Sequence, residues 1–499
     1  MNVIRRRSPE PSDELAERQS GLVPGAHVDE RWLPATLADL PGIAQTLLVD
    51  RARLVSIFLA HRPRRSLVAA FALRGELISL RAELPDTQGS YRALSRFTPA
   101  ALIPERVLYE LEDVTPTGHP RLTSILSPDA DDFSRSVRGE GTFVIPYGPI
   151  RSGVFESIQY VIDTGGEDVL SAQVRPFFKH RGLERRFEGL SVRDGAFLAE
   201  RVSGPAAVAH AVAYSEAVER ALKITPSPEA QRWRVVHAEL ERIASHLEVA
   251  TRLAEDAALA VGVARVGILK EDVMRLRARL SGSRFGRGAV APGGPGSEPL
   301  VSAAEILSRI ERFERDFDRD RKLLLDTGSF TDRLIGSGTL DPATIDAYGG
   351  IGPIARACSV AVDARFERPY GAYRHLGLRI ASATSGDAMA RLAVRFEEIE
   401  TSVHLIRQVL RPRRRGEVID DGRLSAPNAN GAAYGWAEAP MGEVVYWVEL
   451  TAGRLSRVRI ASPSLRNWPL FAESFRGDVL TDFSFIEHSF GLSPAGADR

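Results

Sequence analysis

Residues 227–250 read SPEAQRWRVVHAELERIASHLEVA, and this stretch decides the fold of the larger part of the chain. Ser227 is a favourable helix N-cap, Pro228 suits the first turn, and Glu229 places an acid near the positive end of the helix dipole. The pattern predicts a long amphipathic helix with one apolar face. Its apolar residues recur at helical spacing, at Trp233, Val236, Leu240, Ile243, Leu247 and Ala250.

Similar apolar stripes run through residues 303–325 and 388–410. Several long helices with one apolar face predict a helix bundle. A β-rich piece precedes them at residues 142–178, and about the last seventy residues return to strand-like alternation, as in residues 444–450. We therefore expect an α+β fold, with a central long-helix bundle and peripheral β-sheets.

The N-terminal part has a different character. Leu67–Leu73 and Leu77–Leu84 predict paired strands separated by Arg74-Gly75, within a small α+β domain. Residues 127–141 are polar and predict a linker. The expected organisation is a flexible N-terminal arm at 1–30, a small domain at 31–130 and a large domain at 140–499.

The composition excludes several functional classes. The chain has 65 basic and 65 acidic residues, so its net charge gives no reason to expect nucleic acid as a partner. A single cysteine excludes an internal disulfide and any cysteine-rich metal site within the chain. The start lacks the apolar core of a secretory signal, and no stretch approaches the roughly 18 uncharged apolar residues of a membrane span. We expect a cytoplasmic protein.

Two short segments resemble the cysteine-bearing motifs of [NiFe]-hydrogenase large subunits. Arg201–Ala206, followed by His210, is similar to R-x-C-G-x-C-x-x-x-H, and Ser489–Arg499 is similar to a segment that ends in D-P-C-x-x-C-x-D-R. The chain's one cysteine, Cys358, lies in neither segment. In register, the four cysteine positions hold Ser203, Ala206, Ser493 and Gly496.

Motifs along the whole chain extend this resemblance. Residues 31–130, with Glu105-Arg106 and Gly118-His119-Pro120, resemble the C-type subunit of NADH-quinone oxidoreductase, respiratory complex I. Residues 140–499 resemble its D-type subunit, which is homologous to hydrogenase large subunits. The same C+D fusion occurs in formate hydrogenlyase and hydrogenase-4 large subunits. The motifs of the larger part include Tyr147–Ile150, His180–Glu184, Ala238–Leu247, Gly352–Ala357, Asp363–Arg365, Pro369–Tyr373, Glu438–Glu443 and Arg459–Ser464.

The departures from the family pattern bear on the chemistry. Nickel and iron in this family sit on four thiolates, because soft sulfur anions suit these metals. A serine hydroxyl is hard and protonated, and alanine and glycine offer no donor atom. The family also places an arginine over the metal, at the position that Met441 holds here. We therefore expect no metal and no cofactor bound by this chain, and hydrogenase activity is disfavoured.

Complex I D-type subunits also lack the cysteines and use the space for a quinone headgroup. There the family relies on a histidine in a Gly-Pro-x-His loop and on a tyrosine near the first segment. Here the loop at residues 148–155 has no histidine, and the tyrosine position falls on Gly204. Quinone remains the candidate ligand of the pocket, since quinone sites are largely apolar, but its polar partners are absent.

Four further features have an ordinary interpretation beside a functional one. His210 is either a residue retained next to the site or a satisfied core histidine. Glu184 could relay protons or pair with an arginine. His237 and Glu241, four apart, are a metal half-site by spacing, although a solvated helix face is favoured. Cys358 is expected to be a buried structural thiol.

The resemblance implies the large peripheral-arm subunit of a complex I-like or hydrogenase-4-like membrane oxidoreductase. It would take part in electron transfer, from NADH or another donor to quinone, without a [NiFe] centre. The alternative is a non-catalytic scaffold. The implied partners are a small subunit that carries iron–sulfur clusters and ion-translocating membrane subunits, which would hold the chain on the inner face of the cell membrane.

Overall fold

The computed structural model describes residues 30–86, 89–126, 139–151, 156–411 and 429–499. The predicted arm, except for its last residue, and most of the predicted linker lie outside these ranges. The chain divides into two compact units, Met1–Leu122 and Thr123–Arg499. Each unit is described by itself.

The first unit is built on a four-stranded sheet of order β1-β4-β3-β2. β3 and β4 form the antiparallel pair predicted around Arg74-Gly75, and β1 joins β4 in parallel. The helices α2 and α3 pack on this sheet and enclose its apolar core. The elements are β1 (Glu30–Ala35), α2 (Leu40–Val49), β2 (Arg53–Ala60), β3 (Ser66–Leu73), β4 (Glu76–Glu83), β5 (Ser90–Arg92), α3 (Leu102–Glu112) and β6 (Thr115–Thr117).

Glu105, from the first unit's signature motif, has a structural role. Its fully buried carboxylate accepts hydrogen bonds from the Tyr91 hydroxyl at 3.1 Å and from the backbone N–H of Leu94 at 2.6 Å and Ser95 at 3.1 Å. Burial and this carboxylate raise the pKa of Tyr91. Glu105 therefore fixes α3 to the turn at residues 94–96.

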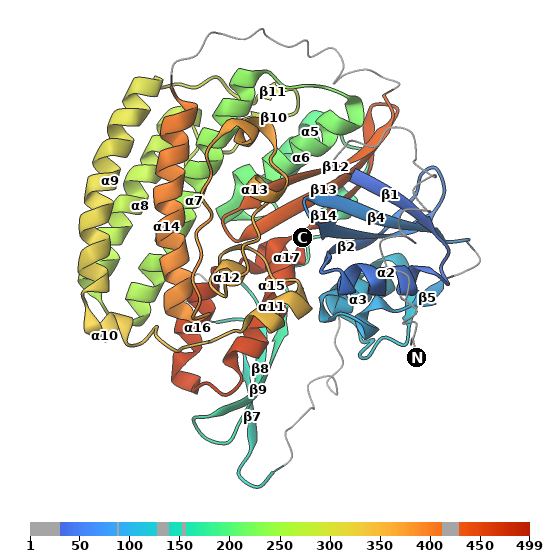
Figure 1. The fold of residues 1–499 in the computed structure, drawn as a ribbon, viewed down its shortest axis with the longest axis horizontal. Coiled ribbons are helices and arrows are strands. Elements are labelled where there is room, and N and C mark those ends of the chain that lie inside the picture. Colours follow the sequence, from blue (N-terminus) through green and yellow to red (C-terminus); the bar gives the residue numbers. More distant parts are fainter. Residues whose placement is uncertain (1–29, 87–88, 127–138, 152–155, 412–428) are drawn as a thin grey trace, which may run out of the picture. The chain divides into compact units, whose positions relative to one another are not determined.

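Long helices stand side by side as a bundle in the second unit, as the sequence predicts (Figure 1). α7 begins at Pro228 with Ser227 as its N-cap, and it packs between α8 and α14. The predicted helices at 303–325 and 388–410 are confirmed as α9 and α14. The helix α8 was not predicted separately. The long helices are α6 (Ala207–Leu222), α7 (Pro228–Asp256), α8 (Ala260–Ser281), α9 (Ala303–Leu325) and α14 (Ala388–Val409).

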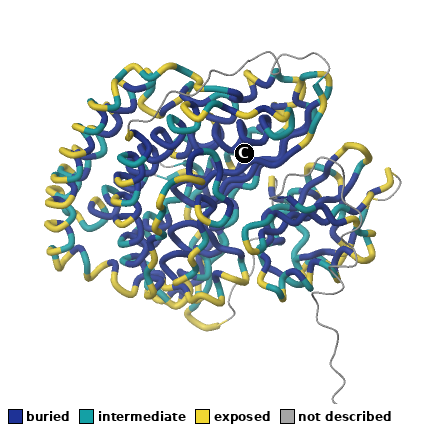
Figure 2. The backbone as a smooth tube through the Cα atoms, turned by 45° about the horizontal axis from the view of Figure 1, so that its top comes forward, coloured by how far each residue is buried: buried dark blue, intermediate teal, exposed yellow. Residues whose placement is uncertain are grey.

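Two three-stranded antiparallel sheets lie beside the bundle. One precedes the helices, as expected, and the other follows them and is covered by α6. Strand β13, near the C-terminus in Figure 2, is buried along almost its whole length. The strands are β7 (Phe143–Tyr147), β8 (Gln159–Thr164), β9 (Val169–Arg175), β12 (Gly431–Ala439), β13 (Gly442–Thr451) and β14 (Arg454–Ala461).

The expectation that the last seventy residues are strand-like is wrong for their second half. After β14 the chain is helical, because Pro463 lies at the first turn of a new helix and aromatic residues then recur on its buried face. These helices are α15 (Pro463–Phe475), α16 (Phe483–Phe490) and α17 (Pro494–Asp498).

Short elements connect the larger ones. Among them, the Gly/Pro-rich loop at 284–296 contains a small hairpin, and Gly352 begins a helix without a preceding strand. The short elements are α4 (Leu183–Arg186), α5 (Val192–Ala199), β10 (Val290–Ala291), β11 (Gly294–Pro295), α10 (Gly328–Thr331), α11 (Pro342–Tyr348), α12 (Gly352–Arg356) and α13 (Ala364–Glu367).

A buried ion network joins the bundle to the β12–β13 hairpin. The guanidinium of Arg356 donates to Glu398 at 2.9 Å, Glu438 at 3.0 Å and Asp363 at 3.2 Å. Arg242 of α7 donates to the Glu438 carbonyl at 2.7 Å. All five side chains are at least 98% buried. Burial of this kind is tolerated only when each charge is paired, so the network fixes these elements in one arrangement.

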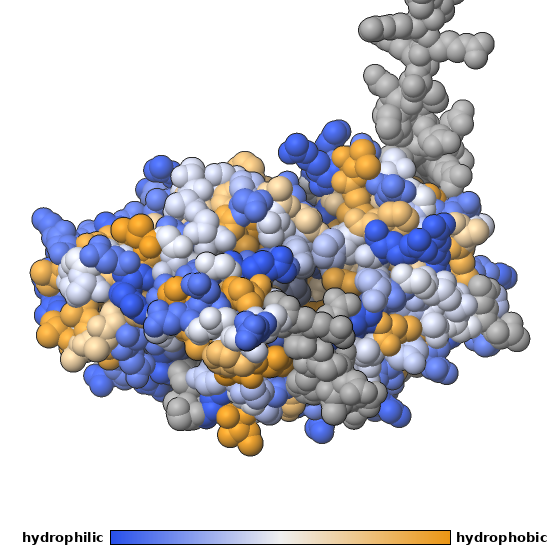
Figure 3. Space-filling view, turned by 90° about the horizontal axis from the view of Figure 1, so that it is seen from below, coloured by the Kyte–Doolittle hydropathy of each residue, from blue (hydrophilic) through white to orange (hydrophobic). Residues whose placement is uncertain are grey.

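The exposed surface mixes apolar and charged side chains. On the face shown in Figure 3, hydrophobic side chains lie in small groups between hydrophilic ones. Within the part of the chain that the structure describes, no helix combines the length and apolar character needed to cross a bilayer.

Candidate functional site

The structure brings three of the four cysteine-equivalent positions into contact. A Cβ atom added to Gly496 would lie 3.3 Å from both Cβ and Oγ of Ser203 and 3.5 Å from Cβ of Ser493. All three residues are buried. The first segment, which leads into α6, and the last segment, which contains α17, therefore pack directly against one another at these positions.

Ala206 and Met441 complete the set of predicted site residues. Ala206 is fully buried, and its N–H donates to the Ser203 carbonyl at 3.4 Å. Met441 lies buried on the turn between β12 and β13, where its carbonyl accepts from Asn467 Nδ2 at 3.3 Å. A Cβ at Gly352 would approach that carbonyl to 2.3 Å, so only glycine fits there. The contacts of Met441 with α12 and α15 hold it through its backbone.

The residues at these positions do not fit a nickel–iron centre. Two of the four have no side-chain donor atom, and the other two are hydroxyls, which are poor ligands for these soft metals. Ser493 Oγ is already engaged in hydrogen bonds. Within the described residues, no three His, Cys, Asp or Glu side chains are placed to share a metal ion.

Arg181, from the His180–Glu184 motif, connects the two segments. Its guanidinium donates to the carbonyls of Arg201 at 2.8 Å and Val202 at 2.7 Å in the first segment, and to that of Ala495 at 2.9 Å in the last. Burial lowers the pKa of Arg181, and the charges of Glu156 and Asp498 oppose this shift. One side chain thus links two segments that are far apart in sequence.

The C-terminus is fixed by a second set of hydrogen bonds. The Asp498 carboxylate accepts from the N–H groups of Phe177 and Lys179, each at 2.7 Å, and burial raises its pKa. The His180 ring nitrogen Nδ1 donates to the Asp498 carbonyl at 2.8 Å. The Arg499 guanidinium donates to Glu184 at 3.0 Å. The last residues are therefore held in place by the turn at 177–184.

Glu156 is a site residue that sequence reasoning missed. It lies in the connection between β7 and β8, and its Oε2 accepts from the Ser493 hydroxyl at 3.0 Å and from the Ala495 N–H at 2.7 Å. No local pattern marks this residue, because its partners lie more than 300 positions away. The carboxylate is bound to one of the four cysteine-equivalent positions.

The loop that lacks the family's histidine has an arginine in its place. Arg151 holds the fourth position of the Gly-Pro-x-His pattern, and its guanidinium pairs with Glu487 of α16 at 2.7 Å. It also lies over the rings of Tyr147 and Tyr160, and the Tyr160 hydroxyl donates to Glu487 at 2.6 Å. Residues 152–155 of the loop lie outside the described residues. Arg151 is thus held by contacts within the chain.

Gly204, at the position of the family's tyrosine, faces open space. No heavy atom lies within 4 Å of a Cβ atom added there. The backbone of this position could carry a larger side chain without a clash at its first atom.

The two residues proposed to lie next to the site are both engaged. Glu184 accepts hydrogen bonds from Arg499 at 3.0 Å, from Arg459 at 3.3 Å and from the N–H of Ile460 at 2.8 Å. It therefore pairs with arginine, which was the alternative to a proton relay. Nδ1 of His210 lies 2.9 Å from the Tyr446 hydroxyl. Burial, aided by the charge of Arg181, lowers the pKa of His210 to about 3, so this imidazole is neutral.

The expectation that His237 and Glu241 lie on a solvated helix face is wrong. Both are buried, because this side of α7 packs against α6 and α8. The Glu241 carboxylate accepts from the N–H groups of Val208 at 2.8 Å and Ala209 at 2.9 Å. It therefore caps the first turn of the helix that follows the first segment.

Cys358 is buried, and its sulfur lies 3.4 Å from the carbonyl oxygens of Leu340 and Ile354, which share its single S–H donor. Burial raises its pKa to about 11. This agrees with the prediction of a structural thiol.

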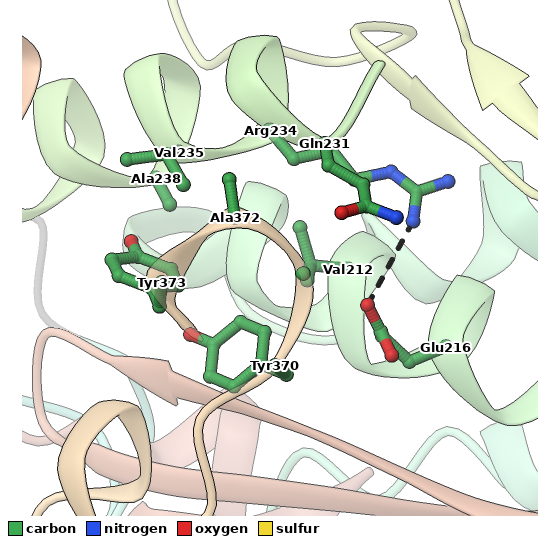
Figure 4. A pocket seen from close by; sticks show the side chains of 10 residues that line it. Val212, Glu216, Gln231, Arg234, Val235, Ala238, Tyr370, Ala372 and Tyr373 are labelled. Carbon is green, nitrogen blue, oxygen red and sulfur yellow. Dashed lines mark ion pairs between the residues drawn. The ribbon is translucent and has the colours of Figure 1, made fainter. Parts of the chain in front are cut away.

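A separate small pocket lies between α6, α7 and the turn at 371–375 (Figure 4). Glu216 and Arg234 face one another across it, with a closest N–O separation of 4.0 Å, and Tyr370 and Tyr373 lie along one side. The space inside it that a water-sized sphere can occupy is about 10 Å³, roughly what a single water molecule needs. Its charged groups neutralise one another, so the pocket has no evident ligand.

The sequence of this chain is similar to those of several known proteins. A model of the respiratory-chain NADH dehydrogenase 49 Kd subunit family matches residues 266–430. The chain is 26% identical over 454 residues to formate hydrogenlyase subunit 5 of Escherichia coli, with 85% of this chain and 79% of that protein covered. It is 26% identical over 554 residues to the fused C/D-type subunit of NADH-quinone oxidoreductase from Gluconacetobacter diazotrophicus, with 96% and 92% covered.

A solved structure shares the fold of the larger part. A chain of the membrane-bound sulfane sulfur reductase, an archaeal respiratory membrane complex, superposes with a TM-score of 0.67 at 25% identity. The match covers 72% of this chain and 99% of that one. The similarity to the fused C/D-type subunit, which extends over nearly the whole chain, confirms the resemblance to a C+D fusion.

Proposed function

Because this chain is similar to subunits of formate hydrogenlyase and of NADH-quinone oxidoreductase, we propose that it is the large peripheral subunit of a membrane-bound oxidoreductase of this kind. We further propose that it works there without a [NiFe] centre. The observation that carries the second part is the direct packing of Ser203, Ser493 and Gly496, where the thiolate positions would stand.

The relatives support the partners in this proposal. In this proposal a small subunit with iron–sulfur clusters docks on the chain, and ion-translocating subunits hold it at the inner face of the membrane. Residues 31–130 act as the C-like domain and residues 140–499 as the D-like domain. Electrons pass from NADH or another donor, through the iron–sulfur subunit, to an acceptor near the interface, for which quinone is the candidate.

A second function, that of a non-catalytic scaffold, is favoured by two contacts. Arg151 pairs with Glu487, and Glu156 is bound by Ser493 and Ala495. Arg151 belongs to the loop that would contribute to a quinone site, Glu156 follows that loop directly, and both side chains are engaged by partners within the chain. A scaffold needs only the fold and not a ligand-binding site, and it would couple the iron–sulfur subunit to the membrane subunits.

One purification tests both functions. The chain, tagged and isolated from its native membranes, is expected to bring down an iron–sulfur subunit and membrane subunits with antiporter-like sequences. The intact complex is then assayed for quinone-dependent oxidation of NADH and other donors. Donor oxidation that a bulky Gly204→Trp substitution abolishes, with the complex still assembled, supports a catalytic role. An assembled but redox-inactive complex supports the scaffold, and isolation of the chain without partners contradicts both.

A further inference from the structure

The Glu156 carboxylate accepts hydrogen bonds from the last segment in the way that the carboxylate of a bound small molecule would. Its carboxylate oxygen Oε2 accepts two hydrogen bonds from residues of the C-terminal motif, the Ser493 hydroxyl and the Ala495 N–H. The Ser493 hydroxyl also accepts from the N–H of Gly496 at 3.1 Å. The contact thus joins the connection between β7 and β8 to the very end of the chain.

The surroundings of Glu156 are rich in donors. Ser203 Oγ is buried and has no hydrogen-bond partner among the described residues. The Arg181 guanidinium is anchored on both segments, and the charge of Glu156 raises its pKa against the effect of burial. The other nearby carboxylate, Asp498, already accepts from two backbone N–H groups. A buried site with such donors is stabilised by an anionic acceptor, because unpaired buried donors are costly.

We propose that Glu156 is the built-in occupant of this site: its carboxylate ties the β7–β8 connection to the C-terminal segment, covers Ser203, and must be displaced by any outside ligand, which would itself carry a carboxylate group. The proposal concerns the folded chain alone. It can therefore fail while the proposed function stands, and the reverse also holds.

The chain's single native thiol makes a direct test practical. Cys358 is 1% exposed and its pKa is raised to about 11, so it should react slowly with a disulfide reagent such as DTNB. The full-length Ser203→Cys variant then carries one reporter thiol at the position that Glu156 covers in this proposal. We expect this thiol to react nearly as slowly as the native background.

Removing the carboxylate should expose the reporter. In the Ser203→Cys background, Glu156→Ala is expected to raise the labelling rate at least about tenfold. This factor corresponds to the free energy of one charge-assisted hydrogen bond. Glu156→Gln, which keeps an acceptor oxygen, should give a smaller increase. The rates are compared at the high-pH plateau, where the thiol is fully ionised, so that a change in its pKa does not count as a change in access.

Three controls make the result decisive. Glu298→Ala, at an exposed carboxylate of the same unit, should leave the rate unchanged. Protection of Cys358 in each variant reports whether the chain is still folded. If Glu156→Ala unfolds it, Ser493→Ala, which removes one donor to the carboxylate, is used instead. Equal plateau rates with and without the Glu156–Ser493 contact would overturn the proposal.

The class of ligand is tested by chemical rescue. Acetate, added to the Glu156→Ala variant, is expected to slow labelling of the reporter, whereas chloride at the same ionic strength should not. An equal effect of the two anions would overturn the assignment of a carboxylate-binding site.

Discussion

The ion network around Arg356 and the site around Ser203 belong to the same unit, yet they are held together in opposite ways. Arg356 has three carboxylate partners in a fully buried setting. Ser203 has a buried hydroxyl with no partner in the described part of the chain, and small neighbours in contact with it. The comparison indicates that the fold of the second unit does not depend on which side chains stand at the four cysteine-equivalent positions. Buried ion pairs such as those of Arg356 hold this fold together.

The largest expected effect comes from breaking the network. Arg356→Ala leaves Glu398 and Glu438 buried beside an empty space, and it should lower the free energy of unfolding by about 3–5 kcal/mol. Chemical denaturation of the full chain measures this. Arg356→Lys should recover only part of the loss, since lysine cannot reproduce the planar fork of the guanidinium. Full stability of the alanine variant would contradict the role given to the network.

A smaller effect, which depends on pH, is expected from Glu241, whose carboxylate caps the first turn of α6. Burial raises the pKa of Glu241 from 4.5 to about 7, although Arg277 and two N–H groups oppose this. A raised acid pKa means that the folded state holds the proton longer than the unfolded state, so this group's contribution to stability is full below about pH 4.5 and falls as pH rises to about 7.

Glu241→Gln removes that titration. The difference in unfolding free energy between the variant and the native chain should therefore shift in the variant's favour as pH rises, by on the order of 1–3 kcal/mol. Thermal unfolding at several pH values measures it, and other titrating groups cancel in the difference. A difference that does not change with pH would show that folding does not raise the pKa of Glu241.

The smallest effect is expected at the ligand positions themselves. Ser203→Ala removes a buried hydroxyl that has no partner, so it should be neutral or stabilise the chain by up to about 1 kcal/mol. Denaturation under the conditions used for Arg356→Ala gives the comparison. A loss as large as that of the network variant would mean that the Ser203 hydroxyl supports the fold.

The fold was largely readable from the sequence, because its strongest signals are local. The Ser227-Pro228-Glu229 start gave the first residue of α7, and apolar periodicity located α9 and α14. The helices after Pro463 were missed, since about the last seventy residues were read from the strands at their beginning. Periodicity also misjudged Glu241, because charged residues at helical spacing look solvated when the helix that covers them is not known.

The site was only partly readable. Family motifs identified the segments at 201–206 and 489–499, and the structure brings Ser203, Ser493 and Gly496 together. The contacts of Glu156 were not foreseen, since they join positions 337 and 339 residues apart and follow no local pattern. Such pairings are set by the fold as a whole, not by the sequence around either residue.

The central claim is that the chain keeps the fold of its relatives, whereas its own side chains fill the position where a nickel–iron centre would lie. Elemental analysis of the chain, purified with its partner subunits from native membranes and compared with a formate hydrogenlyase-type complex prepared in the same way, tests this most directly. The account predicts iron from the partner's clusters and no stoichiometric nickel. Nickel in equal amount to the chain would contradict it.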